Sequence, residues 1–469
     1  MAEAPSFDVS RIIDERPITA FNWGLVIFSF FVIMFDGYDI GAISLAGHGM
    51  IAEWKFPPSE MGYAISSGLF GILFGSPILG FVGDRWGRKI AIAVSSLIFG
   101  VFTLLVVWAG SIEQVIWLRF FAGIGIGGLL PNVIALNAEF APKRMRATMV
   151  IIMFCGITFG GSLPAFTSIA WVATHGWRIL FWIGGILPLI MAVLVFWLMP
   201  ESIKFLVVKH KSRERIVAIM RNLVPNFSAP ADARFAIRDE KDYKGFNPKY
   251  LFSDGLAPIT ITLWICFVCN LMAFYFIVGW MPIILPLFHF TFVQGAFATA
   301  LFQLGGTVGG LAIARPIDTK GLMPVLVLFV IAVPITCLIG FVGLQAAWLM
   351  FLMVALAGFC TLGLQFGLNA ASALIYPTAF RSNGSGWAFA VGRVGSIAGP
   401  LIGGVLVTYK VPLSWVYVCA AVPFAIGTVS AIYLTRYYYR RFEGGLGSAH
   451  DTYLGATARS SGAKSVPGS

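Results

Sequence analysis

The sequence predicts an all-α membrane protein in which twelve transmembrane helices form two pseudo-symmetric six-helix bundles. Three observations support this fold class: a composition too apolar for a soluble domain, twelve apolar segments of membrane-spanning length, and an internal duplication.

Composition excludes a soluble domain. Of the 469 residues, 58% are hydrophobic and 11% are charged, and the mean hydropathy is +0.86. Soluble domains average about 25% charged residues. The 42 Phe, 14 Trp and 13 Tyr residues fit contact with membrane lipid. The net charge of +11 does not predict a nucleic-acid partner, because the basic residues gather in short connectors between apolar segments.

Twelve segments are each long enough to cross a bilayer, which takes about 20 residues. We expect spans at 21–45, 60–82, 90–110, 113–138, 147–171, 178–199, 257–282, 293–314, 323–345, 347–374, 383–408 and 412–436. The connectors on the side of the N-terminus contain GDRWGRK, APKRMR, the basic stretch 204–249 and RYYYRR. By the positive-inside rule, this side is cytoplasmic.

The first 20 residues lack the apolar core of a signal peptide, so we expect both termini in the cytoplasm. The expected organisation is a cytoplasmic N-terminal segment (1–20), an N-terminal six-helix bundle (21–199), a cytoplasmic central loop with short surface helices (200–256), a C-terminal six-helix bundle (257–436) and a cytoplasmic disordered tail (437–469).

Neither the cysteines nor the histidines form a recognisable site. The six cysteines lie in apolar segments, and the pair Cys266 and Cys269 has no partner pair, so we interpret all six as core residues. The five histidines are scattered, without metal-ligand spacing or a Ser-His-Asp grouping. We therefore expect no metal, no cofactor and no enzymatic activity.

The two halves resemble each other. AGIGIGGLLPNVIALNAEFAPKRMR (122–146) aligns with AGFCTLGLQFGLNAASALIYPTAFR (357–381) at an offset of 235 residues, which pairs Gly123 with Gly358. Many secondary transporters repeat six spans in this way, with the substrate site near the bilayer midplane between the halves.

Several motifs resemble those of a known superfamily. GFVGDRWGRKI (80–90), LRFFAGIGIGG (118–128), EFAPKRMR (139–146) and PESIKFL (200–206) are similar to motifs of the major facilitator superfamily, the last two to its sugar-porter-like branches. DGYD in the first span and YPTAFRSNGSGWAFAVGRVGSIAGP (376–400) resemble the aromatic acid:proton symporter family of bacterial inner-membrane carriers. The resemblance implies the major facilitator fold and roles for Asp36, Asp39, Arg119, Glu139, Arg381 and Arg393.

One departure from the pattern is visible in the second half. Its copy of the loop motif has Thr319 and Leu322 where the first half has Arg85 and Arg88. We therefore expect a weaker gate in that half.

Two acids lie three residues apart in the apolar stretch FVIMFDGYDIGAIS (31–44). At about 1.5 Å per residue, Asp36 and Asp39 lie roughly 22 and 27 Å from the cytoplasmic end of the first span, a depth similar to that of Arg119 on the fourth. We expect Arg119 to pair with one of them. Two carboxylates this close do not both ionise easily, which indicates that Asp36 or Asp39 binds a coupling proton and that Arg119 helps to expel it. The alternative is a structural pair that holds the first span against the fourth.

Arg393 lies roughly 15 Å deep in the eleventh span, and the only acid between residues 257 and 436 is Asp318, in a connector. An unpaired buried guanidinium is costly. Its partner is the carboxylate of an anionic substrate, Asp36 or Asp39, or a backbone carbonyl. A carrier of anions favours the first, because guanidinium binds carboxylate through two hydrogen bonds.

Polar side chains on the seventh, eighth and tenth spans add donors, among them Gln365 and Asn369 at four-residue spacing. The expected substrate-binding set is Arg393, Tyr275, Asn270, Gln303, Gln365 and Asn369. For any single polar residue of this set, a bond to a neighbouring helix is an equally good interpretation.

Charges at the cytoplasmic ends of the second and fourth spans predict a gate. Salt links there would close the inner side in one state and break in the other. The expected gating set is Asp84, Arg85, Arg88, Glu139, Arg146 and Arg381. The alternative, that the cations only fix orientation, does not explain Asp84 or Glu139.

The sequence therefore predicts a proton-coupled symporter that imports a small aromatic carboxylate of the benzoate, hydroxybenzoate or protocatechuate type across a bacterial inner membrane by alternating access. Alternatives are a carrier of another organic acid (a dicarboxylate or sugar acid), a sugar porter, or a receptor that binds without accumulating. A neutral sugar leaves Arg393 without a purpose. The expected partners are the aromatic carboxylate, the proton and membrane lipid, with no nucleic acid, and we expect a monomer.

Overall fold

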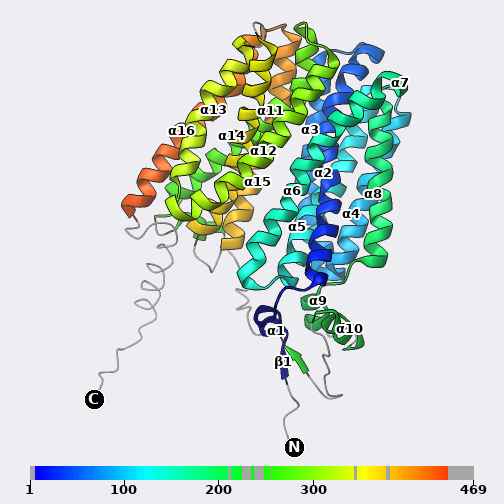
Figure 1. Cartoon of the computed structure of the whole chain (residues 1–469), viewed down its shortest axis with the longest axis vertical. Coiled ribbons are helices and arrows are strands. Elements are labelled where there is room, and N and C mark those ends of the chain that lie inside the picture. Colours follow the sequence, from blue (N-terminus) through cyan, green and yellow to red (C-terminus); the bar gives the residue numbers. More distant parts are fainter. Residues whose placement is uncertain are drawn as a thin grey trace, which may run out of the picture. The chain divides into compact units, whose positions relative to one another are not determined.

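The computed structural model describes residues 6–209, 213–223, 234–236, 248–253, 255–342, 346–376 and 381–441 (Figure 1). Within these residues, twelve helices are long and apolar enough to cross a membrane. This confirms the predicted fold class and the predicted number of spans.

The first six spans fill the N-terminal half of the chain. They are α2 (Ala20–Trp54), α3 (Pro58–Trp86), α4 (Arg88–Leu105) with the 3-10 turn η1 (Val106–Trp108), α5 (Ile112–Phe140), α6 (Arg146–Thr167), continued by the π-helical turn η3 (Ser168–Val172) and α7 (Ala173–His175), and α8 (Arg178–Leu198). The 3-10 turn η2 (Lys143–Met145) joins α5 to α6.

The other six spans are α11 (Ala257–Leu287), α12 (Phe292–Lys320), α13 (Met323–Val342), α14 (Ala347–Ile375), α15 (Arg381–Thr408) and α16 (Leu413–Arg441). α16 therefore continues beyond residue 436, where the sequence analysis ended the last span. The predicted tail from residue 442 onward lies outside the described residues.

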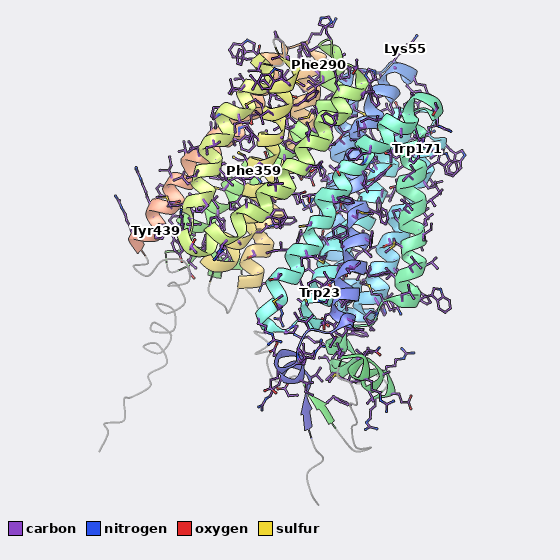
Figure 2. The ribbon with its side chains drawn as sticks, viewed as in Figure 1. Trp23, Lys55, Trp171, Phe290, Phe359 and Tyr439 are labelled. Carbon is purple, nitrogen blue, oxygen red and sulfur yellow. The ribbon has the colours of Figure 1, made fainter. Side chains whose placement is uncertain are left out.

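Local sequence signals set the ends of α2. Thr19 and Asn22 form a capping box at its start, in which the Asn22 side chain accepts a hydrogen bond from the Thr19 backbone N–H at 3.2 Å. Lys55 ends the helix in a left-handed conformation with φ of 53°. Trp23 and Lys55 therefore mark opposite ends of α2 (Figure 2).

The chain divides into two compact units. Unit 1 comprises Met1–Asp242 and Met281–Ala300, and unit 2 comprises Tyr243–Trp280 and Leu301–Ser469. The turn between α11 and α12 thus belongs to unit 1, where the ring of Phe292 lies 6.0 Å from the ring of His48 in α2.

Small elements gather at one end of the helices of unit 1, which we call the loop end (Figure 1). They are β1 (Ser6–Asp8), α1 (Val9–Glu15), α9 (Ile203–Val208), α10 (Arg213–Leu223) and β2 (Arg234–Ala236). β1 pairs with β2 in parallel, with Phe7 opposite Phe235. The helices α9 and α10, like η4 (Pro248–Phe252), fall in the predicted central loop; the rest of that loop lies largely outside the described residues.

Apolar side chains anchor these small elements. Val9 and Ile13 of α1 are buried, as are Ile216 and Met220 of α10. The sequence FDVSRIID and the amphipathic stretch RERIVAIMRNL therefore each bury one face rather than lying free on the surface.

Glycines allow the helices of each unit to approach closely. In unit 1, a Cβ on Gly160 of α6 would overlap the carbonyl oxygen of Met34 in α2. In unit 2, a Cβ on Gly395 of α15 would overlap the carbonyl oxygen of Val268 in α11. Gly160 and Gly395 are separated by the same 235 residues as the repeat found in the sequence (395 − 160 = 235). The duplication is therefore expressed in equivalent helix contacts within the two units.

Candidate functional site

A deeply buried ion pair joins α2 to α5. The guanidinium of Arg119 donates from Nη1 to Oδ1 of Asp39 and from Nη2 to Oδ2, each at 2.5 Å. The side chains of Arg119 and Asp39 are 4% and 2% exposed. The predicted pairing of Arg119 with one aspartate is therefore present, and Asp39 is the partner.

The surroundings of this pair are shaped to hold it. A Cβ on Gly68 of α3 would lie 3.1 Å from Nη2 of Arg119, so glycine there leaves room for the guanidinium. Asp36 is buried one helical turn before Asp39. Between them on α2, the Tyr38 hydroxyl lies 3.4 Å from Oγ1 of Thr167.

Further along α2 and α5, two buried amides link these helices. Asn137 donates from Nδ2 to the Ser29 hydroxyl at 2.7 Å, and Asn22 donates to the Phe140 carbonyl at 2.7 Å. Their signal in the sequence is the same as for any polar residue in an apolar span.

In unit 2, three of the predicted substrate-binding amides form one chain. Asn270 of α11 donates from Nδ2 to Oε1 of Gln365 in α14 at 3.0 Å, and Gln365 donates from Nε2 to Oδ1 of Asn369 at 3.2 Å. This leaves Oδ1 of Asn270 buried without a hydrogen-bond partner among the described residues. The chain of amides therefore ends in an acceptor.

The other predicted substrate-binding residues lie on α11, α12 and α15. Gln303 is 2% exposed, and its Oε1 is also buried without a partner among the described residues. Tyr275 is buried with its ring 4.9 Å from that of Phe274, and Phe274 lies 6.1 Å from Phe302, the neighbour of Gln303. The half-buried Arg393 lies over the ring of Phe389 at 4.8 Å.

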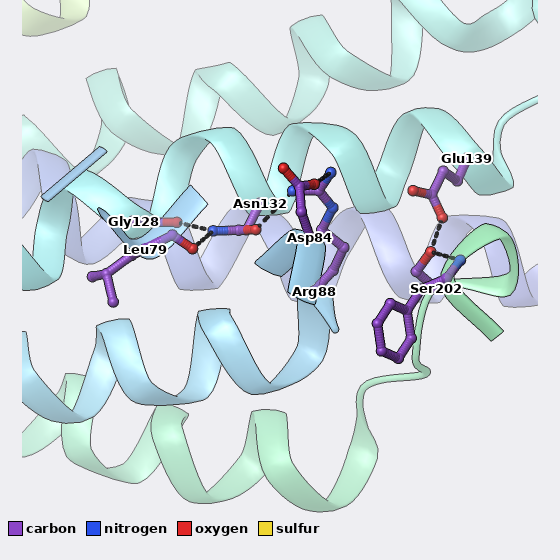
Figure 3. Close-up of polar contacts among 8 residues, drawn as sticks. Leu79, Asp84, Arg88, Gly128, Asn132, Glu139 and Ser202 are labelled. Atoms are coloured by element: carbon purple, nitrogen blue, oxygen red, sulfur yellow. Dashed lines mark hydrogen bonds and ion pairs between the residues drawn. The ribbon is translucent and has the colours of Figure 1, made fainter. Parts of the chain in front are cut away.

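Residues of the charged motifs form two groups of polar contacts, one around Arg88 and Asn132 and one between Glu139 and Ser202 (Figure 3). Arg88 donates to Oδ1 of Asp84 at 2.5 Å and to Oδ1 of Asn132 at 3.1 Å. Asn132 in turn donates to the carbonyls of Leu79 and Gly128, which ties this pair to α3 and α5. Asn132 was not among the predicted gate residues.

The remaining predicted gate residues have other partners. Glu139 accepts a hydrogen bond from the hydroxyl of Ser202 (Figure 3). Arg146 donates to the Ala141 carbonyl at 3.5 Å, and Arg85 lies 5.5 Å from the ring of Trp86. Arg381 is the first residue of α15, and its side chain lies outside the described part of the structure.

Glu201, in the quoted motif PESIKFL, adds a half-buried carboxylate beside this cluster. Its Oε1 accepts from the backbone N–H of Ser202 at 2.9 Å and of Lys89 at 3.2 Å. Burial raises the pKa of Glu201, and these hydrogen bonds oppose the rise. Its Oε2 lies against Gly87, whose φ of 115° few other residues adopt.

Within the described residues, no group of three or more His, Cys, Asp or Glu side chains is arranged to hold a metal ion. The structural features instead define a repeated helical membrane protein with a buried ion pair in one repeat and a chain of amides in the other.

Comparison with known proteins identifies the class. The family model described as Major Facilitator Superfamily matches residues 29–365. The chain is 31% identical to a gallate transporter of Pseudomonas putida over 423 residues, which cover 90% of this chain and 93% of the relative. It is 29% identical to a 4-hydroxybenzoate transporter of Pseudomonas aeruginosa (91% and 95% covered) and 31% identical to a benzoate transport protein of Acinetobacter baylyi (90% and 91% covered).

Solved structures show the same fold. An inward-facing bacterial homologue of the human lysosomal transporter Spinster matches with a TM-score of 0.67 at 16% identity, covering 90% of this chain and 99% of that one. A partially occluded, inward-open form of the xylose transporter of E. coli matches with a TM-score of 0.65 at 16% identity, covering 89% and 98%. The chain belongs to the Major Facilitator Superfamily and, within it, to the aromatic acid transporters. Membership of a transporter family also confirms that it is not an enzyme.

Proposed function

We propose that the protein is a proton-coupled symporter that imports a small aromatic carboxylate across the inner membrane by alternating access. Full-length similarity to transporters of gallate, 4-hydroxybenzoate and benzoate carries the choice of substrate. The buried pair of Asp39 and Arg119, with Asp36 one turn away, supports proton coupling.

Coupling follows from the chemistry of that pair. Protonation of Asp39 removes the charge that Arg119 contacts, so the occupied and empty states of the proton site differ in how strongly α2 is bound to α5. Asp36 is close enough on the same helix to share or relay the proton. The structural alternative, a pair that only joins the two helices, predicts transport that does not depend on a pH gradient.

The anion is assigned to the polar side chains on α11, α12, α14 and α15. Arg393 anchors the carboxylate, and Asn270, Tyr275, Gln303, Gln365 and Asn369 provide hydrogen bonds around the ring. A half-buried guanidinium on an aromatic ring supports this role, because it retains donors for a ligand carboxylate.

The gate is assigned to the loop end of unit 1, which we place in the cytoplasm together with both termini. The gating set is Asp84, Arg85, Arg88, Glu139 and Arg146 of unit 1, together with Arg381, which begins α15 in unit 2. The pairs Arg88–Asp84 and Glu139–Ser202 support it, since each joins a loop-end residue to a neighbouring element. The division into bundles at 21–199 and 257–436 and a monomeric state complete the proposal.

Uptake into proteoliposomes tests the proposal. We expect radiolabelled 4-hydroxybenzoate to accumulate when the outside is made acidic, and accumulation to vanish when a protonophore collapses the gradient. Benzoate, protocatechuate and gallate should compete, whereas xylose and succinate should not. Accumulation that persists without a pH gradient would refute coupling, and binding without accumulation would identify a receptor.

A further inference from the structure

Arg16 is a buried guanidinium outside the membrane spans, between α1 and α2. Its side chain is 7% exposed. Nη1 donates to the Leu223 carbonyl at 3.1 Å and to the Thr19 hydroxyl at 3.5 Å, and Nη2 donates to the Phe140 carbonyl at 3.1 Å. Its hydrogen bonds among the described residues thus go to uncharged oxygen atoms rather than to a carboxylate.

The two carbonyls share a property that explains this choice. Phe140 is the last residue of α5, and Leu223 is the last described residue of α10. The final carbonyls of a helix have no partner within it and lie at the negative end of the helix dipole. One guanidinium therefore caps two helices, one from a membrane span and one from the central loop.

Independent contacts tie the same segments together. The Arg144 guanidinium donates to the Arg16 carbonyl at 3.1 Å, so the turn between α5 and α6 is bound to the N-terminal segment in both directions. Asn22 also donates to the Phe140 carbonyl. In addition, β1 of the N-terminal segment pairs with β2 of the central loop.

We propose that Arg16 is a positioning residue of the transport cycle. By capping α5 and α10 together, it makes the N-terminal segment, the α5–α6 turn and the central-loop helix one rigid clamp. Glu139 precedes Phe140, so the clamp fixes the position of that carboxylate beside Ser202. This inference rests on the gate assigned above to the loop end.

The position of Arg16 predicts which step it controls. Asp39 lies roughly 28 Å along α2 from the start of that helix, at about 1.5 Å per residue, so Arg16 is far from the proposed proton site. The hydrogen bonds of Arg16 go to Thr19, Phe140 and Leu223, none of which belongs to the proposed ligand-binding set. Loss of the clamp should therefore change the rate at which the gate opens and closes, and leave ligand affinity unchanged.

Hydrogen–deuterium exchange of the full chain in detergent tests the clamp directly. In Arg16→Gln we expect deuterium uptake to rise together in 137–146 and 213–223, while the outer part of α5 keeps its protection. Arg16→Lys should show a smaller rise, because its ammonium lacks the forked geometry that reaches two carbonyls. The matched control is Arg11→Gln, since Arg11 is exposed and pairs with Glu15 on α1.

Uptake kinetics of 4-hydroxybenzoate test the consequence. We expect Arg16→Gln to lower Vmax at least about fivefold while KM stays within about twofold, with Arg16→Lys between it and the parent. Should Arg16→Gln fail to fold, Arg16→Lys takes its place in both assays. Exchange that rises in one segment alone, or in neither, would overturn the clamp, as would a raised KM at unchanged Vmax. If the parent protein transports no aromatic acid, the proposed function fails while the exchange assay still judges the clamp.

Discussion

At the scale of single residues, Arg119 and Asp39 show how little freedom a charge has inside the spans. Both side chains are almost fully buried, and two parallel hydrogen bonds join them. Such a pair need not add stability over two apolar residues, but removing one partner leaves the other charged and buried. The pair therefore constrains the interface between α2 and α5.

Replacing one residue of this pair should destabilise the fold more than replacing both. We expect Asp39→Asn to lower the free energy of unfolding by about 3–5 kcal/mol, because Arg119 then loses the counter-ion that it contacts. Adding Arg119→Met should restore part of that loss. Thermal unfolding of the purified variants in detergent provides the measurement. Equal stability of Asp39→Asn and the parent would show that the guanidinium finds another partner.

The unpartnered acceptors of unit 2 lead to a prediction about ligand preference. Oδ1 of Asn270 and Oε1 of Gln303 have no hydrogen-bond partner among the described residues. A buried acceptor left without a hydrogen bond costs about 1–3 kcal/mol. A phenolic hydroxyl donates to either, whereas a methoxy group does not. We expect 4-hydroxybenzoate to bind about tenfold more tightly than 4-methoxybenzoate.

Gln303→Met should bring the affinities for 4-hydroxybenzoate and 4-methoxybenzoate closer together and leave the affinity for benzoate unchanged. Isothermal titration calorimetry on the purified protein measures each affinity. Gln114→Met is the control, because Gln114 lies in unit 1 and accepts a hydrogen bond from the backbone N–H of Gly110. An unchanged ratio in Gln303→Met would exclude this amide from recognition of the hydroxyl.

At the scale of elements, side chains from distant segments cap the helix ends at the loop end. Glu201, which follows α8, accepts from the backbone N–H of Lys89 in the first turn of α4. The first N–H groups of a helix lack partners within it, and a carboxylate is favoured there by the helix dipole. Arg16 does the converse for the carbonyl ends of α5 and α10.

The raised pKa of Glu201 gives a pH dependence with a definite sign. Its ordinary pKa is 4.5, and burial raises the pKa in the folded protein. Below both values the group is protonated in either state and has no effect. As the pH rises from 4.5 through the raised value, the unfolded chain loses its proton first, so folding becomes less favourable.

Glu201→Gln removes that dependence while keeping an acceptor for the backbone N–H groups. We therefore expect the melting temperature of Glu201→Gln, relative to the parent, to increase between pH 4.5 and neutral pH. Scanning fluorimetry across that range measures the difference. A constant difference at all pH values would mean that Glu201 titrates alike in the folded and unfolded states.

At the scale of the whole molecule, the duplication is visible in how helices pack. Gly160 lets α6 approach α2 in unit 1, and Gly395 lets α15 approach α11 in unit 2. In each case the atom that a side chain would strike is a backbone carbonyl, which cannot rotate away. Small residues at such contacts are the usual basis of helix association in membranes.

Alanine at either position should therefore separate the helices. We expect Gly160→Ala and Gly395→Ala each to lower the free energy of unfolding by about 1–3 kcal/mol. Gly24→Ala and Gly386→Ala are the controls, because a Cβ at those helical glycines meets nothing within 4 Å. Their stability should match or slightly exceed that of the parent, since alanine favours helix. Thermal unfolding of all four variants measures these stabilities. A loss of stability in Gly160→Ala but not in Gly395→Ala would show that the two repeats pack differently.

The sequence by itself determined the number of spans, the repeat and the family. The spans can be counted because a chain that crosses lipid must form a helix that satisfies its own backbone hydrogen bonds, and each such helix is a long apolar segment of the sequence. It also determined that Arg119 needs an acid of similar depth. Only the tertiary structure decided that this acid is Asp39, that Glu139 bonds Ser202, and that Arg16 caps two helices. These contacts depend on the rotation of each helix about its axis and on pairing between distant segments; Glu139 and Ser202, for example, are 63 residues apart. Neither periodicity nor motif spacing specifies such contacts.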